Sequence, residues 1–290
     1  MLSKSSRLWP DSATILERSR GVFFSQWEEL LRLRKVAIIT SDPDDIHDLR
    51  VASRRFRAVL ELFYPFVPKG AKTELRKSVR MLTRILGGLR NVDEARLFFA
   101  ARMKTDISAG DKLFHRLSGQ RSSELKLISQ VLKEFDHRAL DRIVRKIVAG
   151  VNEHSFTSRN SISLLAYFSD VSIRQYLPIH HLLTVSTAPE QRASRHALRI
   201  AIKKWRYFFE LISQILDREY TSFLELLKDY QSLLGRMNDI AEFENLLRKL
   251  KLPPDERDHI AVTLLAEDAI LLGDFTALIE HKPLVYTFLI

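Results

Sequence analysis

The chain reads HDLRVASRRFRAVLELF at residues 47–63 and HALRIAIKKWRYFFELI at residues 196–212. The two stretches align without a gap at an offset of 149 residues. A second pair of blocks follows in the same order, LGGLRNVD at 86–93 and LGRMND at 234–239. Two matched blocks at nearly the same spacing indicate an internal duplication, so the chain should fold as two similar halves.

The composition favours helices. Only 9 glycines and 9 prolines punctuate 290 residues, hydrophobic residues make up 46%, and no run of alternating β-branched residues is present. We therefore predict an all-α protein with a sizeable core. Helices are expected over 21–35, 43–63, 71–103, 110–134 and 137–154 in the first half, and over 161–176, 189–217, 219–250 and 255–281 in the second. Breaks are expected at Pro178 and Pro253-Pro254, and a bend or break at Gly87-Gly88.

About four helices in each half predict paired four-helix bundles. We assign residues 1–19 to an N-terminal tail and residues 20–285 to one domain. Its halves should cover about 20–154 and 155–285.

The sequence also restricts the compartment. It contains no cysteine, which excludes disulfides, thiolate zinc sites and cysteine nucleophiles. The first 20 residues lack the apolar stretch of a signal peptide, and no uncharged apolar run is long enough to span a membrane. We predict a cytoplasmic protein without a membrane span.

The chain is strongly basic, with 46 Lys and Arg against 36 Asp and Glu and a net charge of +10. A folded protein with this charge repels itself, and the usual reason is a negatively charged partner. The alternative is a surface over which the charges are merely scattered. The placement of the charges along the helices therefore matters.

On a helical wheel, the basic residues of the 43–63 helix form one stripe opposite its apolar residues. The apolar side consists of Leu49, Phe56, Val59, Leu60 and Phe63. The basic stripe, or ladder, consists of His47, Arg50, Arg54 and Arg57, and the second copy places His196, Arg199, Lys203 and Arg206 at the same angles. Each ladder is about 15 Å long.

The 71–90 segment is divided in the same way. Its apolar stripe consists of Leu75, Val79, Leu82, Leu86 and Leu89, and its basic face of Arg76, Lys77, Arg80 and Arg84, with Arg90 nearer the edge. No acidic residue lies between Glu74 and Asp93, or between Glu190 and Glu210. Exposed helix faces usually mix signs, because Glu–Lys pairs stabilise them. The pattern favours an anionic ligand, with an ordinary solvated face as the alternative.

Equivalent histidines and glycines accompany the ladders. His47 and His196 could form hydrogen bonds at a helix start or bundle seam, or contact phosphate; a metal role ranks third, because the ladders supply cations. Gly87, Gly88 and Gly235 interrupt good helices, for which close helix packing is favoured over backbone approach to phosphate. Bridging or local backbone contacts, and no catalytic role, are expected for Asn91, Asp93, Asn238 and Asp239.

The motifs HxxRVAxRRxR from His47 and LGxLRNxD from Leu86 resemble those of the CHAD domain, the conserved-histidine α-helical domain. The second copy is similar to the C-terminal half of that family, and the resemblance covers roughly residues 20–285. It implies two four-helix bundles related by a pseudo-twofold axis, with basic side chains lining a central groove or pore. It further implies that this pore binds inorganic polyphosphate and has no catalytic activity of its own.

The resemblance also implies which residues contact polyphosphate. Carried over by motif position, they are His47, Arg50, Arg54, Arg57, Arg80, Arg84, Arg90, His196, Arg199, Lys203 and Arg206. Asn91 departs from the family, which commonly has Asp there, and the 220–239 helix carries only Lys228 and Arg236, so the site should be lopsided. The Glu-x-Glu-x-Lys signature of the triphosphate-tunnel domain, to which some members are fused, is not matched at 242–246, where Leu246 replaces Lys.

We therefore predict a polyphosphate-binding protein that is not an enzyme and uses no metal or cofactor, a function compatible with association with polyphosphate granules. The first alternative is binding of the nucleic-acid backbone, although no aromatic residues are interleaved with the basic stripes. The second is a phosphohydrolase or metalloprotein, for which the sequence offers no converging carboxylates.

Overall fold

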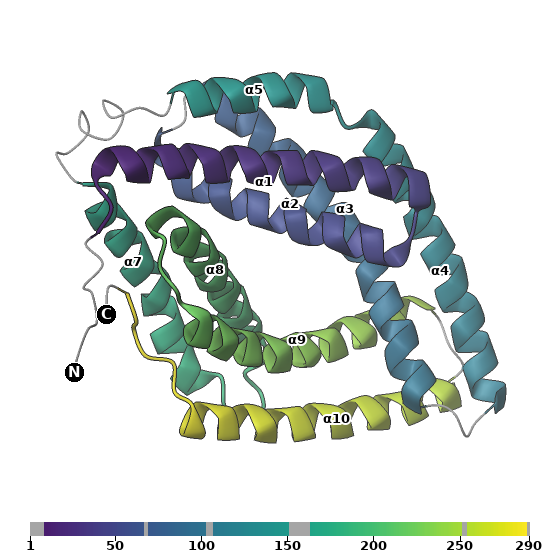
Figure 1. Cartoon of the computed structure of the whole chain (residues 1–290). Helices are drawn as coiled ribbons and strands as arrows, with labels where there is room; N and C mark the ends of the chain where they lie inside the picture. Colours follow the sequence, from purple (N-terminus) through teal and green to yellow (C-terminus); the bar gives the residue numbers. More distant parts are fainter. Residues whose placement is uncertain (1–8, 67–68, 103–106, 151–162, 251–253, 289–290) are drawn as a thin grey trace, which may run out of the picture.

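The computed structural model describes residues 9–66, 69–102, 107–150, 163–250 and 254–288. Within these ranges the protein consists of nine α-helices and no strand, which confirms the all-α prediction (Figure 1). No helix in this part of the chain is long and apolar enough to cross a bilayer. The first half contains α1 (Ser12–Thr40), α2 (Pro43–Phe63), a 3-10 turn (Tyr64–Phe66), α3 (Lys69–Arg102), α4 (Ile107–Glu134) and α5 (His137–Gly150). The second contains α7 (Leu164–Val185), α8 (Arg192–Leu216), α9 (Thr221–Leu250) and α10 (Pro254–His281).

The helices of the two halves pack in the same order. In the first half α1 packs on α2, α2 on α3 and α3 on α4, and in the second half α7 packs on α8, α8 on α9 and α9 on α10. Between the halves, α1 and α2 both pack against α8, and α3 packs against α9, so two pairs of helices that are equivalent in the repeat meet each other. As a result α2, α3, α8 and α9 surround the middle of the molecule (Figure 1).

The apolar stripes predicted for α2 and α3 form the core. Each of their residues is at most 1% exposed, namely Leu49, Phe56, Val59, Leu60, Phe63, Leu75, Val79, Leu82, Leu86 and Leu89. Burying these faces removes apolar surface from water, which is the main favourable contribution to folding. It also fixes the direction of the opposite, basic faces.

Equivalent aromatic residues anchor the two cores. Phe56 of α2 and Trp205 of α8 occupy the same position in the repeat, and both are fully buried. The ring centroid of Trp27 lies 5.1 Å from that of Phe56, and the centroid of Phe223 lies 4.9 Å from that of Trp205. Such pairs contribute about 0.5–1.5 kcal/mol each beyond their buried area.

The first helix is longer than predicted. It begins at Ser12 instead of Gly21, because the Asp11 side chain accepts a hydrogen bond from the Thr14 amide at 2.7 Å and caps the helix. Residues 12–19, assigned to the tail, are its first two turns, and Ile15 is buried in the core.

Two predicted breaks are absent. α7 continues through Pro178 to Val185, and α3 is continuous across Gly87 and Gly88. Packing against α8 holds the part of α7 beyond the proline, where Ile179 is fully buried. The predicted helix ends near 103, 154 and 161 and the break at Pro253 lie outside the described residues.

We expect Pro178→Ala to raise the free energy of unfolding by roughly 1–3 kcal/mol, because proline in a helix interior lacks the amide donor and crowds the preceding turn. Urea unfolding followed by circular dichroism measures this change. Pro43→Ala is the matched control, since Pro43 is the first residue of α2, where proline is tolerated. Equal effects of the two substitutions would contradict the prediction.

Candidate anion-binding site

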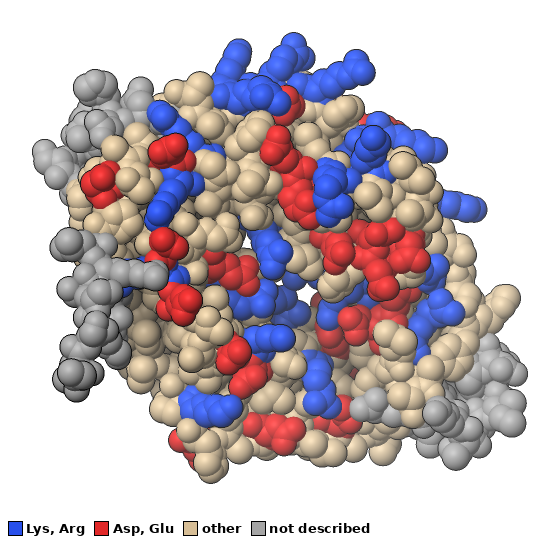
Figure 2. Space-filling model, in the orientation of Figure 1, with Lys and Arg blue, Asp and Glu red and all other residues tan. Residues whose placement is uncertain are grey.

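Two residues of each ladder lie together where α2 packs against α8. Arg50 and Arg54 of α2 lie close enough to Arg199 and Lys203 of α8 for their charges to act on one another. We call these four residues the central cluster. Figure 2 shows a hollow edged by basic side chains in the region that α2, α3, α8 and α9 surround in Figure 1.

Arg50 and Arg199 are the most deeply placed members of the central cluster. They are equivalent in the repeat and only 6% and 8% exposed. The Nε atom of each is buried without a hydrogen-bond acceptor among the described residues. Leaving a buried charged donor unsatisfied costs about 1–3 kcal/mol or more. Both guanidinium groups therefore keep a hydrogen-bonding capacity that the described chain does not use, and an anion beside them would compensate their buried charge.

The central cluster destabilises its own charged state. Burial lowers the pKa of Lys203 to about 6, and repulsion from Arg199, Arg54 and Arg50 contributes. Burial and the charge of Arg54 lower the pKa of Arg50 to about 9. Burial likewise lowers the pKa of Arg54 and of Arg199. An anion in the hollow would relieve this repulsion.

Arg90 lies at the edge of the central cluster and is paired within the chain. Its Nη1 and Nη2 atoms donate to Asp239 of α9 at 2.8 and 3.0 Å, and Glu94 lies 3.4 Å from it. Burial lowers the pKa of Arg90, but Asp239 more than offsets it, so the net shift is upward. The bridge between helices expected of Asp239 is present, and this carboxylate also acts on Arg199.

The last residue of each ladder is paired with a glutamate of its own helix. Arg57 lies 3.7 Å from Glu61, and its equivalent Arg206 lies 3.5 Å from Glu210. Glu210 is also 3.6 Å from Arg55. Arg57 and Arg206 therefore differ from the central cluster in having acidic partners.

The two histidines are exposed at the other end of the ladders. The Nδ1 atom of His196 lies 2.6 Å from the Asn238 side-chain oxygen, so this residue makes the α8–α9 seam contact that was one of its two leading interpretations. His47 stands at the equivalent place on α2. In the described ranges, no group of three or more His, Cys, Asp or Glu side chains could hold a metal ion.

Arg80 and Arg84 are exposed on α3 and line a separate surface cavity of about 560 Å³. The structure thus brings Arg50, Arg54, Arg199 and Lys203 together, with Arg90 at their edge, and does not place Arg80 and Arg84 among them.

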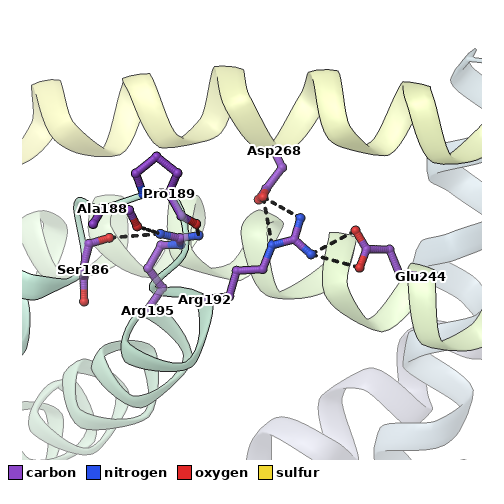
Figure 3. A network of polar contacts seen from close by, with 7 residues as sticks. All are labelled: Ser186, Ala188, Pro189, Arg192, Arg195, Glu244 and Asp268. Atoms are coloured by element: carbon purple, nitrogen blue, oxygen red, sulfur yellow. Dashed lines mark hydrogen bonds and ion pairs between the residues drawn. The ribbon is translucent and has the colours of Figure 1, made fainter.

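Two cations of the acid-free stretch between Glu190 and Glu210 have structural partners. Arg192 donates to Glu244 of α9 at 2.9 Å and to Asp268 of α10 at 2.8 Å (Figure 3). Arg195 donates to backbone carbonyl groups, those of Ser186, Ala188 and Pro189. For Arg192 the predicted anionic compensation comes from distant parts of the same chain, whereas Arg195 is held by nearby backbone carbonyl groups.

Tyr207 is a site residue that our sequence reasoning did not select. It is nearly buried, and it lies close enough to Arg54 to act on the pKa of that residue. The sequence contains a signal for it, because a tyrosine stands in the second copy where the first copy has Ala58. The extra phenol makes the two halves of the site unequal.

The departure at Asn91 leaves a weaker contact between helices. The Asn91 amide donates to Glu242 of α9 at 3.3 Å. Of the glycines, Gly88 fits the packing interpretation, since a Cβ atom there would overlap the carboxylate of Glu124 on α4. A Cβ atom on Gly235 would be 3.9 Å from the Nε atom of Arg199.

The fold and the site together define this chain as an all-α protein with buried cations where equivalent helices of a duplication meet. The chain matches the family model of the CHAD domain over residues 22–248, and it belongs to that family. No curated protein matches the chain.

Two solved structures have a similar fold. One is the crystal structure of the CHAD domain from the plant Ricinus communis, at 22% identity and a TM-score of 0.73, covering 94% of this chain and 93% of that one. The other is PptA from Streptomyces chartreusis, at 14% identity and a TM-score of 0.66, covering 91% of this chain and 97% of that one.

We expect Lys203→Met to raise the melting temperature at pH 7 by at least about 2–4 °C, the change that 1 kcal/mol produces in a domain of this size. Because folding lowers the pKa of Lys203 from 10.5 to about 6, the unfolded chain holds this proton more tightly, and the lysine disfavours folding at neutral pH. The gain should be largest below about pH 6 and vanish near pH 10.5.

Thermal unfolding at several pH values measures this effect. Lys204→Met is the control, since Lys204 is exposed on the same helix. A lower melting temperature for Lys203→Met would show that the central cluster does not repel this lysine.

Proposed function

We propose that the protein binds inorganic polyphosphate in the central cluster and catalyses no reaction on it. The observation that carries this proposal is the burial of Arg50 and Arg199, whose Nε atoms have no acceptor among the described residues. Arg54 and Lys203 add two further cations to the same hollow. The three guanidinium groups, joined by Lys203 when it is protonated, repel one another, and a bound anion would offset that repulsion.

The charge of the central cluster and its origin in two helices favour polyphosphate among anions. Arginine binds phosphate oxygens through two parallel hydrogen bonds, and lysine acts as a point charge. Cations contributed by two helices can contact successive phosphates of one chain. The family resemblance of the motifs points to the same ligand.

Nucleic acid is the second candidate, since basic helices also suit its backbone. Tyr207 is an aromatic residue beside the central cluster, but it is nearly buried and lies close to Arg54. It offers no open platform on which a base could stack. Long-chain polyphosphate should therefore displace single-stranded nucleic acid at a much lower phosphate concentration than the reverse.

We also propose that residues 20–285 form one domain of two four-helix bundles, α1–α4 and α7–α10, related by a pseudo-twofold axis. The contacts of α2 with α8 and of α3 with α9 support this arrangement, because a twofold axis brings equivalent helices together. The cytoplasmic location, with association with polyphosphate granules, stays a prediction.

Changing Arg50, Arg54, Arg199 and Lys203 together to Gln should weaken polyphosphate binding at low salt at least about 100-fold, because four phosphate contacts are lost. The variant should keep its helicity, since the substitutions remove repulsion. Isothermal titration calorimetry and circular dichroism test the two statements. The matched control changes four exposed cations of α4 and α5 to Gln, namely Lys126, Arg138, Arg142 and Lys146. Equal losses in both variants would reject the central cluster as the site.

Binding should tighten roughly ten- to fifty-fold between about pH 8 and pH 6, because an anion raises the pKa of Lys203 and its binding takes up a proton. The free protein, in which this pKa is about 6, gains the charge only near the lower pH. Affinities for long-chain polyphosphate at several pH values measure the slope. Lys203→Arg should flatten it, so an unchanged slope would show that Lys203 is not its cause.

A further inference from the structure

The basic surface of α3 continues beyond the central cluster. Lys77, Arg80, Arg84, Gly87 and Arg90 follow one another at spacings of three or four residues, so each is next to the following one on the helix surface. From Lys77 to Arg90 this line of residues advances about 20 Å along the helix axis and winds about 140° around it. One end lies beside the central cluster, and the other reaches the surface of the protein.

We call Lys77, Arg80 and Arg84 the outer ridge. These residues are exposed and have no acidic partner among the described residues, unlike Arg145, which lies 2.8 Å from the carboxylate of Asp141. The surface is hollowed where they lie, in a cavity of about 560 Å³ whose lining also includes Thr73, Arg76 and Met81. The cations therefore border a groove.

Gly87 lies between the outer ridge and Arg90. It is helical, and a Cβ atom built there would have nothing within 4 Å. Close packing, which the sequence favoured, therefore does not explain it, although glycine in a helix costs about 1 kcal/mol relative to alanine. The bare backbone leaves an unobstructed surface between Arg84 and Arg90.

The equivalent surface of α9 is not basic. Aligned on Gly87 and Gly235, the positions of Lys77, Arg80 and Arg84 are taken by Glu225, Lys228 and Ser232. The outer ridge therefore belongs to one half only, which agrees with the lopsided charge that the sequence predicted.

We propose that a polyphosphate chain longer than the hollow leaves it across Gly87 and lies along the outer ridge, so that the protein prefers long chains. This inference rests on the proposed function of the central cluster. A chain held in the hollow presents its free segment to the ridge at high effective concentration, so weak additional contacts raise the affinity. Tripolyphosphate, too short to occupy both segments, gains nothing from the ridge.

The test compares affinities for tripolyphosphate and for long-chain polyphosphate at one low salt concentration. Arg80→Gln combined with Arg84→Gln should weaken long-chain binding about tenfold and tripolyphosphate binding less than about twofold. The control changes Arg138 and Arg142 of α5, which are also exposed and four residues apart but do not line the cavity beside Arg80 and Arg84. The control should alter neither affinity by more than about twofold.

The outcomes separate the two proposals. Failure of the wild-type protein to bind either ligand would reject the proposed function and this inference with it. Equal loss for both ligands would place Arg80 and Arg84 in the primary site, and an unchanged long-chain affinity would remove them from the path. Either of these results overturns the inference while leaving the central cluster intact.

A second variant tests the path without changing charge. Gly87→Leu should stabilise α3 and cover the backbone between Arg84 and Arg90, so it should reduce long-chain binding and leave tripolyphosphate binding unchanged. A stably folded Gly87→Leu protein with full long-chain affinity would contradict a path across Gly87.

Discussion

Repulsion among buried cations at the contact of α2 and α8 is the constraint on which the rest of the structure depends. Each helix buries an apolar face in its own half, with Phe56 and Trp205 at equivalent positions. The opposite, basic faces of α2 and α8 then lie against each other, and Arg50 and Arg199 are buried together between them. The fold is stable because its two cores outweigh this unfavourable arrangement.

The cations of the protein fall into two groups, those with acceptors in the same chain and those of the central cluster. Arg192 and Arg90 tie helices together through carboxylates of the same chain, and Arg195 holds backbone carbonyl groups. The central cluster has no such partners among the described residues, and the lowered pKa of Lys203 is the consequence. A polyanion would supply there what acidic residues supply elsewhere in the molecule.

Much of this arrangement could be predicted from the sequence, because a duplication and a helical period are both local patterns. They gave the helical class, the apolar faces of α2 and α3, and the ladders. The partners of Arg192 could not be found, since Glu244 and Asp268 are far away in the chain. The pairing of Arg57 with Glu61 has the ordinary i,i+4 spacing of a helix, so the sequence alone is enough to predict it. The helical course of α7 through Pro178 needed the packing of α8, which no local pattern contains.

The most direct measurement of the central claim is a crystal structure of the protein with bound polyphosphate. Our account predicts phosphate density in the hollow, beside the guanidinium groups of Arg50 and Arg199. Density confined to other surfaces, with the hollow filled only by water, would contradict it.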